Sequence, residues 1–313
     1  LTAINTHTGA IDLDVGSIVI GGAGQLESGS YTGAVDIATG ATLQYASSAE
    51  QTLAGVISGA GLLIKDTANS SLTLSAVNSF SGAIDLDLGS LILSAASQLQ
   101  SGSYAGAVDI ADGSTLRYSS SAEQTLSGVI SGAGFLVKDV ADSSTLTLSG
   151  VNSYSGDIDI DAGAVVIGSA GQLESGNYSG ALDIATGTSF EYASSEDQTL
   201  SGVISGGGDL IKDVDSALIL TGVNTHTGTI NIDQGSVVIG GAGQLESGNY
   251  AGAVDIAGGA TLQYASSTDQ IVSGVISGAG VLLKDTETSV LTLTAVNTHT
   301  GNIGLDSGSI VIA

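Results

Sequence analysis

The chain repeats itself with a period of roughly 73 residues, and a period of this size limits what it can fold into. The motif Asn-[Thr/Ser]-[His/Phe/Tyr]-[Ser/Thr]-Gly starts at Asn5, Asn78, Asn152, Asn224 and Asn297. The motif Gly-Val-Ile-Ser-Gly follows each of the first four at a constant spacing, at Gly55, Gly128, Gly202 and Gly274. A lysine then follows, again at the same spacing in every copy, at Lys65, Lys138, Lys212 and Lys284. Repeats of this length are typical of stacked, quasi-one-dimensional folds.

Only the step from each lysine to the next Asn varies in length. It runs from Lys65 to Asn78, from Lys138 to Asn152, from Lys212 to Asn224 and from Lys284 to Asn297. We therefore expect every other residue to have a fixed place in a coil, with one loop free to change length. The repeats are 1–73, 74–147, 148–219 and 220–292, with a partial fifth at 293–313. Because each repeat of such an array packs against its neighbours and is stabilised by them, we predict a single solenoid over residues 1–313.

Short runs of alternating apolar and polar residues fill each copy. In the second copy they lie at 72–75, 83–87, 90–93, 107–111, 115–118, 124–127 and 135–138, with Gly, Ser, Asn or Asp between them. This alternation predicts strands, and no stretch has a sustained helical period. Short strands would also fit a sandwich or a propeller, but the two-residue Asn-Gly or Asp-Gly loops of hairpins are scarce. We predict an all-β, right-handed parallel β-helix with about three rungs of roughly 24 residues per repeat, about 13 in all.

The composition supports a ladder-rich chain and restricts its partners. Proline is absent, as suits backbone N–H groups that serve in sheets, and with no Trp and three Phe we expect a narrow, aliphatic interior. The net charge of −26 predicts that the chain has no nucleic-acid partner. The sequence contains no run of 18 apolar residues, so we expect no membrane insertion of this segment. Without Met or a basic-then-apolar leader, we expect a processed or excised piece whose targeting signal lies elsewhere. The absence of Cys leaves the redox compartment open.

Paired aspartates are the candidate metal site. The corner Asp-x-Gly recurs in all five copies, and three copies add a second Asp two residues earlier, giving Asp12 and Asp14, Asp85 and Asp87, and Asp159 and Asp161. Residues two apart on a strand share a face, so these carboxylates could hold Ca²⁺. The alternative is a turn-forming role with solvated partners, which the replacements Asn231 and Gly304 in the last two copies favour. Beyond Ca²⁺, the sequence predicts no cofactor.

The other recurring polar and aromatic residues have structural and functional interpretations. His7, His226 and His299 share a repeat position with Phe80 and Tyr154, which favours a packing ring over a catalytic base. Each repeated lysine precedes an Asp, and we expect it to bridge to an acidic neighbour on the next rung. Eight tyrosines are expected to pack or to stack on the surface, where they could bind sugars: Tyr31, Tyr45, Tyr104, Tyr118, Tyr178, Tyr192, Tyr250 and Tyr264.

About half of each repeat resembles a known family. Gly132-Ala-Gly-Phe-Leu-Val-Lys followed by Leu146-Thr-Leu-Ser-Gly-Val-Asn-Ser-Tyr-Ser-Gly is similar to the autotransporter-associated β-strand repeat of bacterial secreted passengers. The resemblance implies a right-handed β-helix exposed on bacterial cells, usually in stalks or adhesins.

Together these observations predict a non-enzymatic structural segment of a bacterial extracellular adhesin, stalk or surface fibre. The alternatives are a filament subunit that stacks end to end, since neither end of the sequence has a polar cap, and a glycan- or cell-binding module. The expected partners are adjacent repeats or further copies of the chain, and surface glycans or proteins of a host or of bacteria. An enzyme would need one differentiated copy, and no copy stands out.

Overall fold

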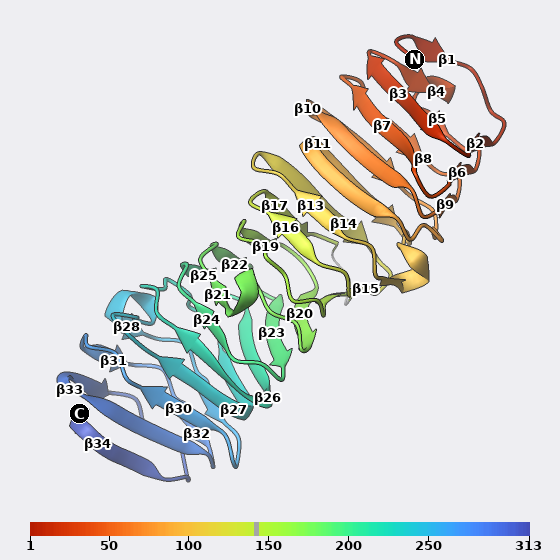
Figure 1. Cartoon of the computed structure of the whole chain (residues 1–313). Helices are drawn as coiled ribbons and strands as arrows, with labels where there is room; N and C mark the ends of the chain where they lie inside the picture. Colours follow the sequence, from red (N-terminus) through yellow and green to blue (C-terminus); the bar gives the residue numbers. More distant parts are fainter. Residues whose placement is uncertain (141–143) are drawn as a thin grey trace. The chain divides into compact units, whose positions relative to one another are not determined.

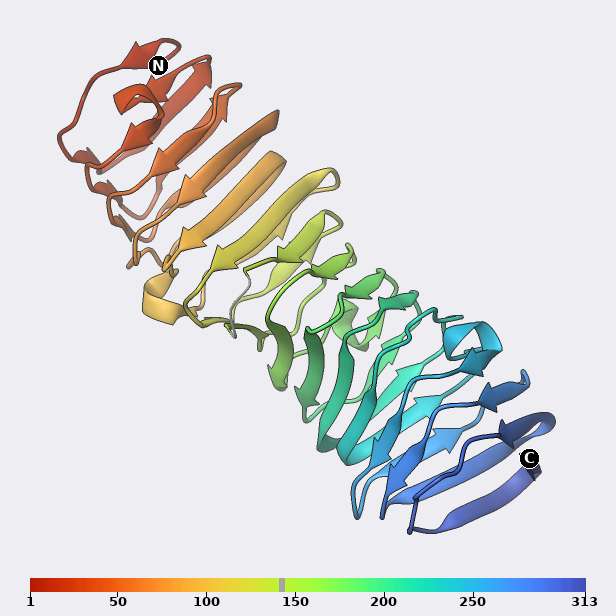
Figure 2. The same cartoon turned by 180° about the vertical axis from the view of Figure 1, so that it is seen from behind.

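A computed structural model describes residues 1–140 and 144–313. Within these residues the chain forms strands and four 3-10 turns, and no α-helix. The described strand pairs are parallel. Within each of the two compact units described below they lie one above another, as Figure 1 and, from behind, Figure 2 show. The fold is a parallel β-solenoid of about 14 turns, which confirms the predicted class.

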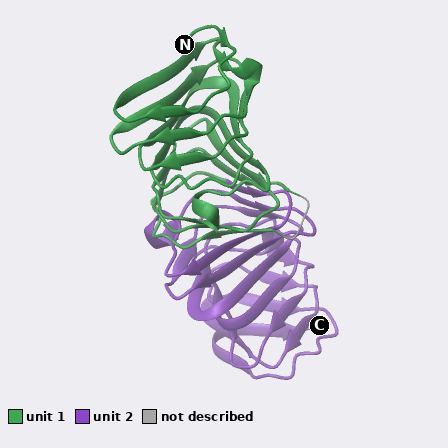
Figure 3. Ribbon diagram, turned by 90° about the vertical axis from the view of Figure 1, so that its right-hand side faces the viewer, with its two compact units in different colours: residues 1–157 green, residues 158–313 purple. Residues whose placement is uncertain are grey.

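The chain divides into two compact units, residues 1–157 and 158–313 (Figure 3). The strands of the first unit are β1 Ile4–Asn5, β2 Ile11–Leu13, β3 Gly16–Gly22, β4 Gln25–Leu26, β5 Ser30–Tyr31, β6 Val35–Ile37, β7 Ala41–Ser47, β8 Gln51–Leu53, β9 Ile57–Gly59, β10 Leu62–Leu74, β11 Ala83–Ala95, β12 Ser103–Tyr104, β13 Val108–Ile110, β14 Ser114–Ser120, β15 Gln124–Leu126, β16 Ile130–Gly132, β17 Phe135–Lys138 and β18 Thr145–Leu148.

The second unit repeats the same order of elements. Its strands are β19 Ile158–Ile160, β20 Ala164–Ser169, β21 Asn177–Tyr178, β22 Leu182–Ile184, β23 Ser189–Ser194, β24 Gln198–Leu200, β25 Ile204–Gly206, β26 Asp209–Leu220, β27 Ile230–Ile239, β28 Asn249–Tyr250, β29 Val254–Ile256, β30 Thr261–Tyr264, β31 Gln270–Val272, β32 Ile276–Gly278, β33 Val281–Leu293 and β34 Ile303–Ile312. The 3-10 turns are η1 Glu27–Gly29, η2 Gln100–Gly102, η3 Glu174–Gly176 and η4 Glu246–Gly248.

The turns are less even than the predicted rung, and most are shorter. In the first unit Ile18 pairs with Leu43, Leu43 with Leu63, and Leu63 with Ile84, so the first of these turns uses more of the chain than the two that follow. The repeat counterpart of Ile18 is Leu91, which lies beyond Ile84 on the same strand. One repeat is therefore about three and one-third turns long.

This extra third of a turn moves each repeat onto the next face of the coil. β3, β7, the first part of β10 and the first part of β11 stack in this order on one face. The repeat counterpart of β3 is the second part of β11, which lies on another face between the second part of β10 and β14. The second unit has the same shift. β20 stacks through β23 on the first part of β26 and of β27, and its counterpart in the second part of β27 pairs with the second part of β26 and with β30.

The interior holds alternate residues of every strand, but it is not purely aliphatic. Leu, Ile and Val dominate the buried set, and tyrosine, lysine, asparagine and glutamine side chains lie among them. The prediction of an aliphatic interior is wrong in this respect, because composition counts the side chains without telling which of them face inward. Among the described residues, no helix is long and apolar enough to cross a membrane.

Candidate functional site

The repeated lysines lie inside the coil. Successive turns place Ile20, Tyr45, Lys65 and Leu86 in one inward-facing column. Lys65 is fully buried, its Nζ donates to the carbonyls of Thr67 at 2.5 Å and Leu88 at 3.2 Å, and it lies 5.8 Å from the centre of the Tyr45 ring. The same lysine-on-tyrosine contact recurs at 5.6–5.8 Å in the other copies, Lys138 on Tyr118, Lys212 on Tyr192 and Lys284 on Tyr264. Lys65, Lys212 and Lys284 donate to backbone carbonyls, so the predicted bridge to an acidic neighbour is wrong for these three lysines.

Burial changes the ionisation of these lysines. It lowers the pKa of Lys65 to about 8, and the nearby Asp66 opposes part of this shift. The pKa values of Lys212 and Lys284 are also lowered, mainly by burial. The tyrosine ring and backbone carbonyls surround the ammonium group and offset part of the cost of removing it from water.

The lysine and a serine hold the two ends of the stretch that varies in length. The sequence predicts a loop here, but in the first and third copies the stretch lies within β10 and β26, where the pairing register shifts. Lys65 donates to Thr67 at its start, and near its end the hydroxyl of Ser70 donates to the carbonyl of Ser47 on the preceding turn, at 2.7 Å. Lys212 and Ser216 make the corresponding contacts with Val214 and Ser194. Insertions therefore fall between two fixed points. In the second copy, residues 141–143 of this stretch lie outside the described residues.

The tyrosines are buried and bonded to the backbone. Tyr45, Tyr192 and Tyr264 donate to carbonyls four residues further on, at 2.6–2.7 Å. The hydroxyls of the other set reach glycine carbonyls of the preceding turn, from Tyr31 to Gly9, Tyr104 to Gly82 and Tyr250 to Gly228. All eight predicted positions are at most 2% exposed, so the prediction of surface stacking and of a tyrosine platform for sugars is wrong.

The position shared by histidine, phenylalanine and tyrosine packs against the next turn. The rings of His7 and Tyr31, Phe80 and Tyr104, and His226 and Tyr250 stack with centres 6.3–6.5 Å apart. His226 is 2% exposed, its Nε2 lies 2.7 Å from the carbonyl oxygen of Gly208, and burial lowers its pKa. The geometry suits a packing ring.

Two recurring amides tie neighbouring turns together, and their structural roles were not predicted. Asn152 Oδ1 accepts the N–H of Ile130 at 2.8 Å, and Asn78, Asn224 and Asn297 do the same for Ile57, Ile204 and Ile276. Gln198 is 1% exposed; its Oε1 accepts from the N–H of Leu173 and its Nε2 donates to the carbonyls of Leu173 and Thr199. Gln51, Gln124 and Gln270 repeat this pattern. Both amides recur in every full copy, and this recurrence was the sequence feature from which a structural role could have been predicted.

Three of the six candidate calcium residues lie beside an aspartate of the next turn. Asp85 lies beside Asp109 of the next turn, and Asp12 and Asp159 lie beside Asp36 and Asp183 in the same way. Burial first, then Asp109 and Asp87, raise the pKa of Asp85. The adjacent carboxylates are bonded to serines, as Ser58 donates to Asp36 and Ser205 to Asp183, both at 2.5 Å. Over residues 1–140 and 144–313, no group of three or more His, Cys, Asp or Glu could hold a metal ion. Calcium binding by the pairs stays a prediction.

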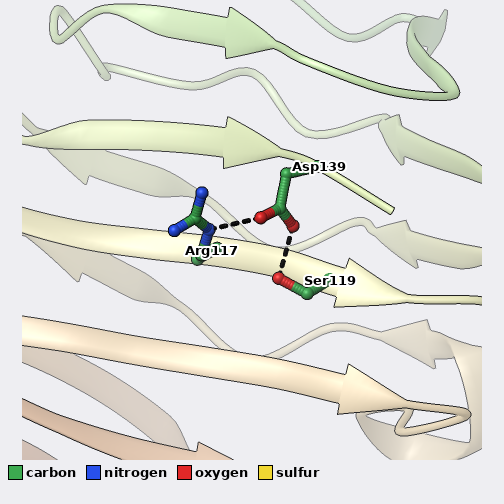
Figure 4. A network of polar contacts seen from close by, with 3 residues as sticks. All are labelled: Arg117, Ser119 and Asp139. Atoms are coloured by element: carbon green, nitrogen blue, oxygen red, sulfur yellow. Dashed lines mark hydrogen bonds and ion pairs between the residues drawn. The ribbon is translucent and has the colours of Figure 1, made fainter. Parts of the chain in front are cut away.

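The single arginine makes a contact between turns at the surface. Arg117 Nε lies 2.6 Å from Asp139 Oδ2, and the hydroxyl of Ser119 donates to the other oxygen of this carboxylate (Figure 4). Asp139 directly follows the buried Lys138. Lys138 therefore packs inside the turn, over Tyr118, while Asp139 binds Arg117 on the outside of the same turn.

Comparison with known families identifies part of the repeat. The Passenger-associated-transport-repeat family matches residues 141–167 and 215–239. Both matches begin in the stretch of variable length, include the buried Asn, and end four residues after the Gly of the Asp-x-Gly corner, on β20 and on β27. These two stretches are similar to the repeats of autotransporter passengers. The resemblance inferred from the sequence is thereby confirmed. Comparisons with curated proteins and with solved structures gave no match.

These repeats indicate a segment of an autotransporter passenger. The family implies a secreted or cell-surface bacterial protein. The matched ranges include Asn152 and Asn224, whose side chains join two turns.

Proposed function

We propose that this segment is a non-enzymatic structural spacer in a bacterial extracellular adhesin, stalk or surface fibre. The observation that supports the proposal is that the repeated polar side chains form hydrogen bonds with the backbone of the coil. Buried asparagine and glutamine recur in the copies and bond to the backbone of a neighbouring turn, and the buried lysines bond to backbone carbonyls. A catalytic centre requires one differentiated group of side chains, whereas these contacts are the same from copy to copy.

The surface charge fits the same role. With 31 acidic and 5 basic residues, of which four lysines are buried, the exterior is strongly negative. Like charges on neighbouring molecules repel each other, so such a surface limits lateral association of parallel segments. We expect the direct partners of each turn to be other turns, from adjacent repeats or from further copies of the chain. Surface glycans or proteins would be partners of the larger passenger.

Deleting one whole repeat tests the spacer role. Joining Lys65 to Asp139 removes residues 66–138, and joining Lys138 to Asp213 removes residues 139–212; both junctions link equivalent positions, so the turn-to-turn contacts there are preserved. In bacteria that display the protein, we expect both deletions to reduce the reach of the passenger equally, as measured by electron microscopy, and to have equal effects on adhesion. Loss of adhesion or of an activity with only one deletion would contradict the proposal and favour a binding or catalytic copy.

A further inference from the structure

One contact between turns recurs on the outside of three of the four full copies. The outward residue just before the buried tyrosine lies diagonally across from the aspartate that follows the buried lysine. Gln44 Nε2 donates to Asp66 Oδ2 at 2.7 Å, and Gln263 Nε2 donates to Asp285 Oδ2 at 3.0 Å. In the second copy Arg117 occupies the position and pairs with Asp139 (Figure 4). In these three copies, an N–H donor meets a carboxylate.

The third copy breaks this rule because Glu191 occupies the donor position. The aspartate across from it is Asp213, and an ionised glutamate has no hydrogen to donate. The Glu191 side chain is half-buried, so water compensates only in part for the missing contact.

The groups around Glu191 add negative charge and no positive charge. Asp213 on β26 and Asp233 on β27 are the charged groups that act on it. Its register neighbours Val166 on β20 and Ile211 on β26 are apolar. Lys212 points into the coil over Tyr192, 5.6 Å from the ring centre.

We propose that Glu191 and Asp213 form a proton-sharing carboxyl pair, which makes the contact between β23 and β26 stronger at acid pH than at neutral pH. A protonated carboxyl group carries an O–H donor, so one proton recreates the donor–carboxylate contact of the other copies. Burial, followed by Asp213 and Asp233, raises the pKa of Glu191, which moves this protonation towards mildly acidic pH. A folded-state pKa above the unfolded one adds stability at low pH that is lost as the pH rises through the folded-state value. The third repeat is therefore a pH-responsive point in an otherwise uniform array.

The test compares Glu191→Gln with the unaltered chain by hydrogen exchange of the β23 and β26 amides between pH 4.5 and 8. The intrinsic pH dependence of exchange cancels in this comparison. Near pH 8 we expect the glutamine variant to exchange about three- to tenfold more slowly, as suits one hydrogen bond to a charged group. The difference should shrink towards pH 4.5. The reciprocal variant Gln44→Glu, opposite Asp66, should exchange faster on β7 and β10 at pH 8 and recover in acid.

Three results would overturn the proposal. One is a difference between Glu191→Gln and the unaltered chain that stays constant with pH, and another is a Gln44→Glu variant without pH dependence. The third is a slowing of exchange by Ca²⁺ at pH 8 in the unaltered chain but not in Glu191→Gln, which would mean that the carboxylates share a metal ion in place of a proton.

Discussion

Replacing a buried glutamine should cost far more free energy of unfolding than replacing a half-buried one whose similar hydrogen bond is exposed to water. Gln198 makes three hydrogen bonds of 2.9–3.1 Å and is 1% exposed. Gln198→Ala leaves the N–H and the carbonyl of Leu173 without this side-chain partner, in an interior that water does not reach. At roughly 1–3 kcal/mol for each unsatisfied group, and with some cavity cost, we expect a loss of about 3–5 kcal/mol in the free energy of unfolding.

Gln172, on the preceding turn, provides the matched control. Its Nε2 donates to the carbonyl of Asp197 at 2.9 Å, but this contact is exposed, so water replaces it in Gln172→Ala. We expect that variant to lose about 0–1 kcal/mol. Urea unfolding followed by circular dichroism measures both losses. Equal losses in the two variants would refute the reasoning that the buried amide joins the turns.

A third variant separates the two halves of the amide. Gln198→Glu keeps an oxygen that accepts the N–H of Leu173, but at neutral pH it sets a negative charge against the carbonyl of Leu173. Protonation restores a donor, so this variant should be destabilised at pH 7 and partly recover near pH 5. A loss that does not change with pH would show that the size of the side chain matters more than its hydrogen bonds.

Two further predictions concern the interior and a third concerns the aspartates on the surface. A Cβ on Gly82 would lie 1.8 Å from the carbonyl oxygen of Gly61, whereas a Cβ on Gly258 would meet nothing within 4 Å. Gly82→Ala should therefore lower the melting temperature strongly, and Gly258→Ala hardly at all. Equal melting temperatures of the two variants would contradict the close stacking of turns. Because the pKa of Lys65 is lowered to about 8, stability should rise from pH 8 to about 10, while unfolded lysine still binds its proton. Stability should fall above pH 10, because tyrosine ionises in the unfolded chain while Tyr192, with its pKa raised by burial to about 12, stays neutral in the folded one. Urea unfolding from pH 7 to 11 measures both changes. Lys65→Met should reduce the rise between pH 8 and 10. If the paired aspartates hold Ca²⁺, adding the ion should raise the melting temperature and Asp85→Asn with Asp87→Asn should reduce the effect; a melt unchanged by Ca²⁺ and by chelator would exclude the site.

The sequence by itself determined the architecture. The fixed spacing from Asn to Gly-Val-Ile-Ser-Gly to Lys, with all length changes in one loop, requires equivalent places in a stacked coil. The alternating runs identified most strands, and the family resemblance followed from the same motifs. These features are local or periodic, so they can be read from the chain without knowing which residues meet.

Only the tertiary structure decided which residues face inward and which turns they join. Lys65 is next to Asp66, and alternation alone fits either residue inside; the column of Tyr45 and Leu86 places the lysine in the interior. The length of each turn depends on how its corners bend, so the extra third of a turn per repeat could not be obtained from the period alone. Glu191 likewise became a distinct position once Asp213 and Asp233 were placed around it. A contact between turns joins residues that are distant in the sequence, and their pairing is set by the packing of the whole coil.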